Sequence, residues 1–318
     1  MSEKRVAVTG AFGFIGSYLT NTLLSQDYRV LAIDNFSTGS RSFVPDHPNL
    51  TILEADITKT GAWMNEIADF GAECVFHLAA IHFIPYCNAH WSECLSVNVI
   101  GTQNVFDAST KAKGIVFASS AAVYGIFDDP HPETQSAAPT DVYGLSKKVG
   151  EEIAILWSAA RQVPVRAARL FNVYGPNETS PHLIPEVMYQ AHRGSDLKLG
   201  NLEPKRDYIF VGDIVSGLIA LSQTFGDGKL FDAYNVGTGL EYSAREVVTI
   251  LGEITGRNFG LGSVPERTRP SDRMHLCADN AKLRSIGWKP AVEIRGGLDR
   301  TWQHFQETGE LKAYSAEK

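Results

Sequence analysis

The fold is decided by the stretch Val6-Ala7-Val8-Thr9-Gly10-Ala11-Phe12-Gly13-Phe14-Ile15-Gly16. A short apolar run leads into glycines spaced G-x-x-G-x-x-G, and an amphipathic segment follows to about Asp27. This order predicts a strand, a tight turn and a helix. Glycine allows φ > 0 and a close approach of backbone to a ligand. The helix N-terminus offers free N–H groups to a pyrophosphate, so the stretch predicts dinucleotide binding.

An acidic residue follows the next apolar run. Residues 28–33 predict a second strand, and Asp34 comes directly after it. A carboxylate about 20 positions beyond the glycines suits the hydroxyls of an adenosine ribose. Because Asp-Asn is also ordinary turn chemistry, Asp34 and Asn35 are weaker evidence than the glycine turn.

Composition and charge narrow the class of protein. The chain has 318 residues, is 44% hydrophobic and 20% charged, and carries a net charge of −7. These values indicate a globular protein and give no reason to expect a nucleic-acid partner. The first five residues enter the first strand directly, which leaves no room for a signal peptide, and no apolar run approaches a membrane span of about 20 residues. The four cysteines lack metal-ligand spacing, so we expect no metal and reduced thiols in a cytoplasmic protein.

Strand and helix signals alternate through the first half of the chain. Further strands are expected at 50–53, 74–80, 115–118 and 165–170, and helices at 61–70, 90–111 and 142–161. Such alternation predicts an α/β fold with a parallel sheet and right-handed crossovers. Ligands bind such sheets at the carboxyl ends of the strands. The residues expected at that edge are Gly10, Asp34, Asp56, Ala79, Ser120 and Asn172.

The pattern loosens after Asn172. A short helix is expected within 181–194, a strand and a helix within 206–224, and a strand at 233–236. Ser243 with Glu246 forms a capping-box pattern that starts another helix. We expect 1–172 and 206–240 to form a cofactor domain, and 173–205 and 241–318 a smaller, interleaved substrate domain.

Tyr143 and Lys147 carry the clearest catalytic pattern. Four residues apart on a helix, their side chains share one face. A nearby cation stabilises a phenolate, so we expect Lys147 to lower the pKa of Tyr143 and make it a general base. Spacing alone is weak evidence, because Tyr314 and Lys318 show it too. Ser120, at the end of the preceding strand, is a candidate partner for the same hydroxyl, although for Ser120 considered alone a turn or capping role is the better explanation.

These features together resemble the extended short-chain dehydrogenases/reductases. Within them the chain is most similar to the NAD-dependent nucleotide-sugar epimerases and dehydratases, and above all to the UDP-glucose 4-epimerase group. The segments that carry the resemblance are the glycine motif, Asp34, His77-Leu78-Ala79-Ala80, Ser119-Ser120-Ala121-Ala122-Val123-Tyr124-Gly125, Tyr143-x-x-x-Lys147, Leu170-Phe171-Asn172-Val173-Tyr174-Gly175-Pro176, Arg206-Asp207-Tyr208 and Arg269-Pro270-Ser271-Asp272. The resemblance implies a Rossmann-type doubly wound parallel sheet with a smaller C-terminal substrate domain.

The resemblance also implies roles for single residues. Ser120, Tyr143 and Lys147 would be catalytic. NAD would be bound by Gly10, Phe12, Gly13, Phe14, Ile15, Gly16, Asp34, Asn35, Asp56, Ile57, Leu78, Ala79, Ala80, Asn98, Tyr143 and Lys147. The nucleotide sugar would be bound by Ser120, Asn172, His182, Leu183, Arg206, Arg269 and Asp272. For Asn98, a buried structural hydrogen bond is the main expectation. Arginine suits a diphosphate because its planar fork binds two oxygens, yet either arginine alone reads as a surface residue.

Several positions depart from the relatives' pattern. His182 replaces a common asparagine, His82 a common lysine, and Leu199-Gly200-Asn201 a common Gly-Asp-Gly, while Leu276 occupies a position that is aromatic in some relatives. These changes leave the sugar and the nucleobase open. The reaction frame is unaffected.

The reaction expected is epimerisation at C4 of a UDP-hexose or related sugar through a transient 4-keto intermediate. A 4,6-dehydratase or uronate decarboxylase, a 4-ketoreductase and a non-catalytic dinucleotide sensor are the alternatives. The Tyr/Lys pair argues against the sensor, and Ala121-Ala122 argue against dehydration and decarboxylation because methyl groups transfer no proton. By resemblance, segments 90–111 and 142–161 predict a homodimer.

Overall fold

The computed structural model describes residues 4–264 and 273–308. They form two compact units by their contacts. Of the described residues, the first comprises 4–125, 133–170 and 215–235, and the second 126–132, 171–214, 236–264 and 273–308. The roles predicted for the two parts of the chain, cofactor binding and substrate binding, stay predictions.

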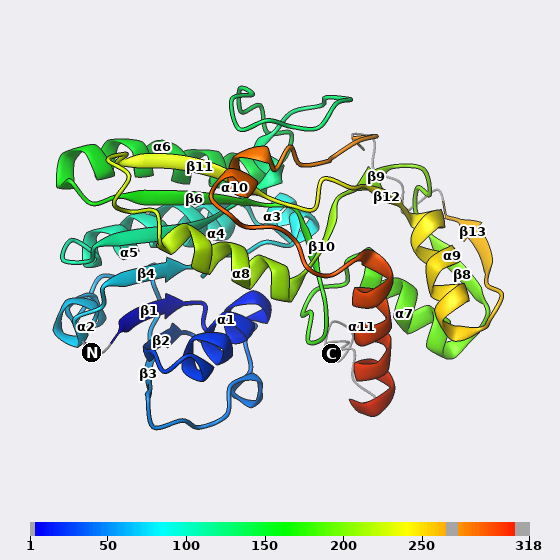
Figure 1. Ribbon diagram of the computed structural model, residues 1–318, viewed down its shortest axis with the longest axis horizontal. Helices are drawn as coiled ribbons and strands as arrows, with labels where there is room; N and C mark the ends of the chain where they lie inside the picture. Colours follow the sequence, from blue (N-terminus) through cyan, green and yellow to red (C-terminus); the bar gives the residue numbers. More distant parts are fainter. Residues whose placement is uncertain (1–3, 265–272, 309–318) are drawn as a thin grey trace. The chain divides into compact units, whose positions relative to one another are not determined.

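A seven-stranded sheet is the centre of the first unit (Figure 1). Its strands are β1 (Arg5–Thr9), β2 (Arg29–Asp34), β3 (Leu50–Glu54), β4 (Cys74–His77), β5 (Gly114–Ser120), β6 (Val165–Leu170) and β11 (Phe231–Val236). Their order is β11-β6-β5-β4-β1-β2-β3, and the pairs from β3 to β6 are parallel. The predicted doubly wound parallel sheet is confirmed.

Helices cover both faces of this sheet, which is why β4 and β5 are buried along their whole length. The helices of the first unit are α1 (Phe14–Ser25), α2 (Trp63–Phe70), α3 (Ile84–Ala89), α4 (Trp91–Leu95), α5 (Thr102–Ala108) and α6 (Val142–Arg161). Short turns of helix are η1 (Arg41–Phe43), η2 (Ser96–Gly101) and η3 (Ala121–Val123). The expected helix over 90–111 is therefore interrupted, because η2 is a π-helical segment.

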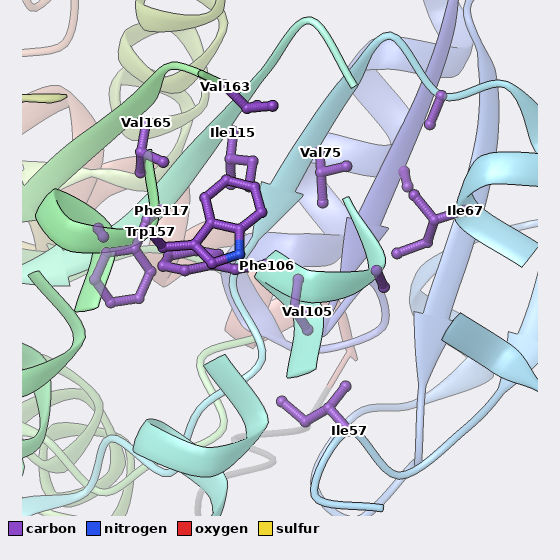
Figure 2. Close-up of a cluster of buried hydrophobic side chains, with 14 of the residues drawn as sticks. Ile57, Ile67, Val75, Val105, Phe106, Ile115, Phe117, Trp157, Val163 and Val165 are labelled. Atoms are coloured by element: carbon purple, nitrogen blue, oxygen red, sulfur yellow. The ribbon is translucent and has the colours of Figure 1, made fainter. Parts of the chain in front are cut away.

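One large apolar cluster fills the space between the sheet and the helices α2, α5 and α6 (Figure 2). Phe117 of β5, Phe106 of α5 and Trp157 of α6 form its aromatic centre. Alternation along β5 turns Ile115, Phe117 and Ser119 toward this face. The core therefore fixes α6 against β5, and with it the helix that carries Tyr143 and Lys147.

The second unit consists of short strand pairs and helices. Its strands are β7 (Asn172–Tyr174), β8 (Asp196–Leu199), β9 (Lys205–Arg206), β10 (Tyr208–Phe210), β12 (Tyr242–Ser243) and β13 (Gly260–Ser263). β7 pairs with β10 and β8 with β13, both in parallel, whereas β9 and β12 are antiparallel. Its helices are α7 (Leu183–Arg193), α9 (Ala244–Thr255), α10 (Ala281–Ser285) and α11 (Ile294–Thr308), and α8 (Val211–Ser222) continues from it into the first unit.

Local sequence explains where several of these elements start. Ser243 accepts the N–H of Glu246, whose carboxylate accepts the N–H of Ser243 in return, so the predicted capping box begins α9. Asp141 caps α6 in the same way by accepting the N–H of Gly144 at 2.8 Å. In the part of the chain that the structure describes, no helix is long and apolar enough to span a membrane.

Candidate active site

The glycine turn after β1 can be built only from glycine at two of its positions. Gly10 has φ +68°, and a Cβ there would lie 2.7 Å from the backbone nitrogen of Ala79. A Cβ on Gly16 would overlap the carbonyl oxygen of Gly10. The turn is thereby pressed against the end of β4, where Leu78, Ala79 and Ala80 are half-buried. The backbone that follows β1 and the backbone that follows β4 are therefore in direct contact, with no side chain between them.

The start of α1 fits a phosphate group. Gly13 is its N-cap and supplies no side-chain acceptor, so the N–H groups of Phe14, Ile15 and Gly16 keep their capacity to donate to an anion. A Cβ on Gly39 would lie 2.7 Å from Phe12, so the loop after β2 also approaches this turn. Any residue larger than glycine at Gly10, Gly16 or Gly39 would place a side chain in this cradle. Its shape and donors fit a dinucleotide pyrophosphate.

Asp34 lies beside this cradle and is 8% exposed. Its two carboxylate oxygens accept the N–H groups of Phe12 at 2.9 Å and of Phe36 at 2.8 Å. Each carboxylate oxygen has a further lone pair, so the group can still accept ribose hydroxyls. The carboxylate therefore joins the glycine turn to the loop that starts at Asn35.

A cation near Asp34 was missed by sequence reasoning. Phe36 has φ +56°, and its ring lies 4.9 Å from that of Phe12, centroid to centroid. The guanidinium of Arg41 lies 5.7 Å from the Phe36 centroid. Asn35 and Phe36 carry no positive charge, but the same loop places the guanidinium of Arg41 beside the Phe36 ring.

Asp56 and Ile57 follow β3. The Asp56 carboxylate accepts both the N–H of Thr58 at 3.0 Å and its hydroxyl at 2.7 Å, which holds the Asp56 pKa below its usual value. Ile57 is buried, and its carbonyl accepts a hydrogen bond from Asn104 at 2.8 Å. Contact of Asp56 and Ile57 with a cofactor stays a prediction.

Ser120, Tyr143 and Lys147 are brought together by β5 and α6. Tyr143 is in the first turn of α6, and the Lys147 ammonium lies 5.8 Å from its ring centroid. The Ser120 hydroxyl accepts the N–H of Ala122 at 3.1 Å, and it lies close enough to the Tyr143 phenol to act on its pKa. The expected catalytic trio is therefore one cluster, and Ser120 also has the capping role that was its alternative.

The electrostatics of the pair differ from the expectation. Burial lowers the pKa of Lys147, which is 3% exposed, to about 8, although the nearby thiols of Cys94 and Cys87 oppose this shift. Burial also raises the pKa of Tyr143 above its usual value, and the hydrogen bond from Ser120 opposes this only in part. Burial therefore shifts the Tyr143 pKa in the direction opposite to the one expected from Lys147, and stabilisation of the phenolate by the Lys147 charge stays a prediction.

Asn98 has the structural role that was expected for it. Its amide oxygen accepts the N–H of Ile81 at 2.8 Å, while its nitrogen donates to the carbonyl of Ile81 at 2.8 Å and to the Ser146 hydroxyl at 2.9 Å. Both amide hydrogens are used, which leaves no donor for a cofactor. Asn98 therefore ties the loop after β4 to α6.

All four cysteines are free and buried, as expected. Cys87 and Cys94 form a small apolar cluster with Val142, against which Tyr143 and Leu95 pack. This wall of the site was not foreseen from sequence.

The second unit holds the described residues that were expected to bind the nucleotide. Asn172 begins β7 and pairs in register with Tyr208 of β10. The guanidinium of Arg206 donates to the carbonyls of Lys205 at 2.8 Å and of Arg273 at 2.7 Å. Arg206 and Glu178 both act on the pKa of Tyr208, which burial raises. Arg206 thus lies in the same neighbourhood as the loop that carries Glu178.

His182 is the N-cap of α7, directly before Leu183. Its Nδ1 lies 2.5 Å from Oε1 of Glu178, whose carboxylate is buried and has its pKa raised by that burial. A buried glutamate as the partner of His182 was not predicted. Arg269 and Asp272 lie outside the described residues.

Asp207 has a different part from that of its neighbour Arg206. Its buried carboxylate accepts hydrogen bonds from the N–H groups of Thr238 at 2.8 Å, Gly239 at 2.8 Å and Ala278 at 3.2 Å. These bonds hold the chain after β11 against the segment that contains Ala278. Asp207 is therefore a structural residue of the second unit.

Comparison with known proteins agrees with this geometry. A profile of the NAD dependent epimerase/dehydratase family matches residues 6–237. A putative UDP-glucose 4-epimerase of Methanocaldococcus jannaschii is 30% identical over 93% of this chain and 96% of its own. UDP-glucuronic acid decarboxylase 1 of Xenopus tropicalis is 27% identical over 98% of this chain and 74% of its own.

Among solved structures, the UDP-glucose 4-epimerase of Thermus thermophilus in complex with NAD superimposes with a TM-score of 0.86. It is 28% identical, and the match covers 96% of this chain and 99% of that one. The glycine cradle, the carboxylate beside it and the Ser120–Tyr143–Lys147 cluster thus occur in a chain whose relatives include both epimerases and decarboxylases. By sequence, fold and site, the chain belongs to the NAD-dependent epimerase/dehydratase family.

Proposed function

We propose that the protein is an NAD-dependent nucleotide-sugar 4-epimerase that acts on a UDP-hexose or a related sugar through a transient 4-keto intermediate. The observation that carries this proposal is the cluster of Ser120, Tyr143 and Lys147 together with Ala121 and Ala122. The cluster supports oxidation of a sugar hydroxyl. The two alanines bring no acid or base for a further elimination.

Each residue of the cluster has a separate role in the oxidation at C4. Tyr143 removes the proton of the sugar 4-hydroxyl as a general base, and Ser120 orients that hydroxyl by a hydrogen bond. The charge of Lys147 stabilises the phenolate. Bound NAD would supply the hydride acceptor for this oxidation and the hydride donor for the return step. Return to the opposite face requires the 4-keto sugar to turn over while the protein keeps water out.

The cofactor would be held by the cradle already described. The N–H groups at the start of α1 would bind the pyrophosphate, and Asp34 the adenosine ribose. In the second unit, Asn172, His182, Leu183 and Arg206 would bind the nucleotide diphosphate, and the remaining predicted contacts are Arg269 and Asp272. A uridine nucleotide is supported by the names of the relatives.

A uronate decarboxylase or a 4,6-dehydratase is the second candidate, and a 4-ketoreductase is the third. The similarity to the Xenopus decarboxylase over 98% of this chain supports the second candidate. A decarboxylase or dehydratase begins with the same oxidation at C4 and therefore needs the same three residues, Ser120, Tyr143 and Lys147. What it needs in addition is a proton-transferring group next to Ser120, and η3 carries alanines there.

A homodimer in the cytoplasm is part of the proposal. α4 and η2 pack beside α6, and Trp91, Ile100, Ile155 and Leu156 are exposed on these helices. Leu156 alone is 73% exposed, which is costly for an apolar side chain unless another surface covers it. We expect a second copy of the chain to bury this side chain.

Light scattering at micromolar concentration should give twice the chain mass, and Leu156→Lys should give the monomer. A monomeric wild type would contradict this.

The function is tested by incubating the purified protein with a panel of nucleotide sugars and identifying the products by NMR and mass spectrometry. A C4 epimer of unchanged mass supports the proposal. Loss of water or of carbon dioxide would show that the second candidate is correct, and a net reduction that requires added cofactor would show the third.

A further inference from the structure

A buried ion pair joins α6, the helix that carries Tyr143 and Lys147, to β6. The carboxylate of Glu151 on α6 faces the guanidinium of Arg169 on β6, with Nη2 2.7 Å from Oε2 and Nε 3.0 Å from Oε1. Both side chains are less than a tenth exposed. Removing two charges from water is costly, so such a pair is weak evidence for stability alone. This arrangement calls for a role beyond stability.

The pair is tied to the strand end that carries Ser120. The hydroxyl of Ser119 donates to Oε1 of Glu151 at 2.5 Å. Side chains alternate along a strand, so Ser119 and Ser120 leave β5 on different sides. Ser119 thus anchors the backbone to α6, while Ser120 lies close enough to Tyr143 of the same helix to act on its pKa. The distance between the two catalytic hydroxyls depends on this anchor.

Arg169 also holds the far end of the same segment. Its Nη1 donates to the Tyr124 hydroxyl at 2.9 Å and to the Glu133 carbonyl at 3.1 Å. Tyr124 follows η3 and in turn donates to Asn235 at 2.7 Å. The turn from Ser119 to Tyr124, with Ser120 inside it, is therefore held at both ends by one charged pair.

Glu151 also brings a charged group to the face of α6 that carries Lys147. Glu151 follows Lys147 by four residues on α6, so both lie on one face of the helix. Because Arg169 neutralises Glu151, Lys147 gains no carboxylate partner from it. Cys87 of α3 and Cys94 of α4 act on the pKa values of both Tyr143 and Lys147, and Asp141 before α6 acts on that of Tyr143. Lys147 in turn lowers the pKa of His77 of β4.

We propose that Glu151 and Arg169 are positioning residues of the reaction: through Ser119 and Tyr124 they fix the Ser120 hydroxyl against Tyr143, and as a neutral pair they keep a net charge away from Lys147. Neither residue is assigned contact with substrate or cofactor. The inference rests on the proposed function only for its kinetic readout.

The same strand offers a matched control. Arg166 of β6 is fully buried and pairs with Asp227 at 2.7 Å, and it also donates to Thr224 and to the Lys229 carbonyl. This second pair fixes the loop after α8. It lies near the start of β6, whereas Ser120 pairs with Leu170 at the end of that strand. Arg166→Met should therefore lower stability without changing the chemistry.

The positioning role is tested with Ser119→Ala, which removes the anchor but leaves the ion pair intact. The expected result is a fall in kcat of about tenfold or more with KM within about twofold, since a misplaced catalytic group costs rate rather than binding. Ser119→Thr, which keeps the hydroxyl, should restore kcat. A Ser119→Ala enzyme with the kcat of wild type would overturn this role.

The charge role is tested with Glu151→Gln, because Arg169 cannot lose its proton and remains as an uncompensated cation. Titration of tyrosinate absorbance in the NAD-loaded protein, with Tyr143→Phe as the reference, reports Tyr143 directly. Its midpoint should fall, because the uncompensated cation of Arg169 favours the phenolate over the neutral phenol. The double variant Glu151→Gln/Arg169→Met should restore the midpoint of wild type. Because it leaves no unpaired buried charge, it can still be measured if Glu151→Gln alone does not fold.

The outcomes separate the two proposals. If wild type turns over no sugar of the panel, the proposed function fails, while the tyrosinate titration still tests the pair. If wild type epimerises a sugar but Glu151→Gln and Ser119→Ala behave like Arg166→Met, the pair is structural only and the inference is wrong.

Discussion

The imidazole Nδ1 of His77 lies 2.7 Å from the hydroxyl of Thr9, and its Nε2 lies 2.9 Å from the hydroxyl of Thr102. Thr102 gives its only proton to the carbonyl of Asn98 at 2.6 Å. It must therefore accept from Nε2–H, which leaves Nδ1 to accept from Thr9. Burial and the charge of Lys147 lower the pKa of His77 to about 3, so this neutral tautomer persists.

Thr9→Val should destabilise the protein by about 1–3 kcal/mol. The substitution keeps the shape of the side chain but leaves the buried Nδ1 without a donor. Urea denaturation gives the change in the free energy of unfolding. Thr22→Val on α1, half-buried and outside this chain of bonds, is the control and should stay within about 0.5 kcal/mol. Equal stability of the two variants would contradict the contribution of the Thr9–His77 hydrogen bond to stability.

Tyr143→Phe should lose turnover by about 10²-fold or more while it still binds the nucleotide sugar. The ring keeps its packing against Cys87 and Cys94, but the proton acceptor is gone. Single-turnover kinetics and calorimetric titration of the sugar measure the two quantities separately. Near-normal turnover in a folded variant would mean that another group is the base.

The rate should fall above about pH 8. Lys147 is charged below its pKa, which burial lowers to about 8, and it is neutral above it, where the phenolate loses its cation. The limb belongs to the coupled Tyr143–Lys147 pair and is measured from kcat against pH. Lys147→Arg should be slower but should lack this alkaline limb, because arginine stays charged. The same limb in both enzymes would assign it to a different group.

The cofactor extracted from the purified protein should be NAD and not NADP. The Asp34 carboxylate would repel a 2′-phosphate, and although Arg41 lies near Phe36 it is exposed. Asp34→Asn should reduce the preference for NAD over NADP by about tenfold, which corresponds to about 1.4 kcal/mol. Asp46→Asn, a neutralised exposed acid of the same loop, should leave it unchanged. Mainly NADP in the wild-type extract would refute the argument.

What the sequence predicted follows from local signals. The glycine turn, the parallel strands and the helix over 142–161 each depend on residues close together in the chain, and the strand ends then place Ser120 near Tyr143. The bonds of His77 to Thr9 and of Glu151 to Ser119 and Arg169 span 68, 32 and 18 residues. They depend on which strands are neighbours and in which register, and no pattern of spacing carries that information.

Two other features depend on three-dimensional surroundings. The sign of the Tyr143 pKa shift is set by burial, which the four-residue spacing to Lys147 does not disclose. The π-helical segment Ser96–Gly101 interrupts a helix that looks continuous in sequence, at the place where Asn98 reaches Ile81 and Ser146. Such segments are frequent at functional sites because they redirect a side chain.

The last prediction concerns the reaction class, and Ala121 and Ala122 decide it. After oxidation at C4 the proton on C5 becomes acidic, and a dehydratase must remove it and protonate the departing 6-hydroxyl. Both alanines are buried in η3, and the nearby Glu133 carboxylate accepts the N–H of Asn235 at 2.9 Å. With no acid or base in η3 itself, the 4-keto sugar should wait for the hydride to return.

Turnover of the accepted sugar in D₂O therefore should give a product of unchanged mass with protium at C5, as read by NMR and mass spectrometry. Ala122→Glu restores a carboxylate beside Ser120 and should begin to exchange C5 with deuterium, whereas Ala122→Gln, of the same size but without an ionisable group, should not. Deuterium at C5 in the wild-type product, or carbon dioxide released from a uronate, would show that a base outside η3 reaches the sugar and that epimerisation is the wrong branch.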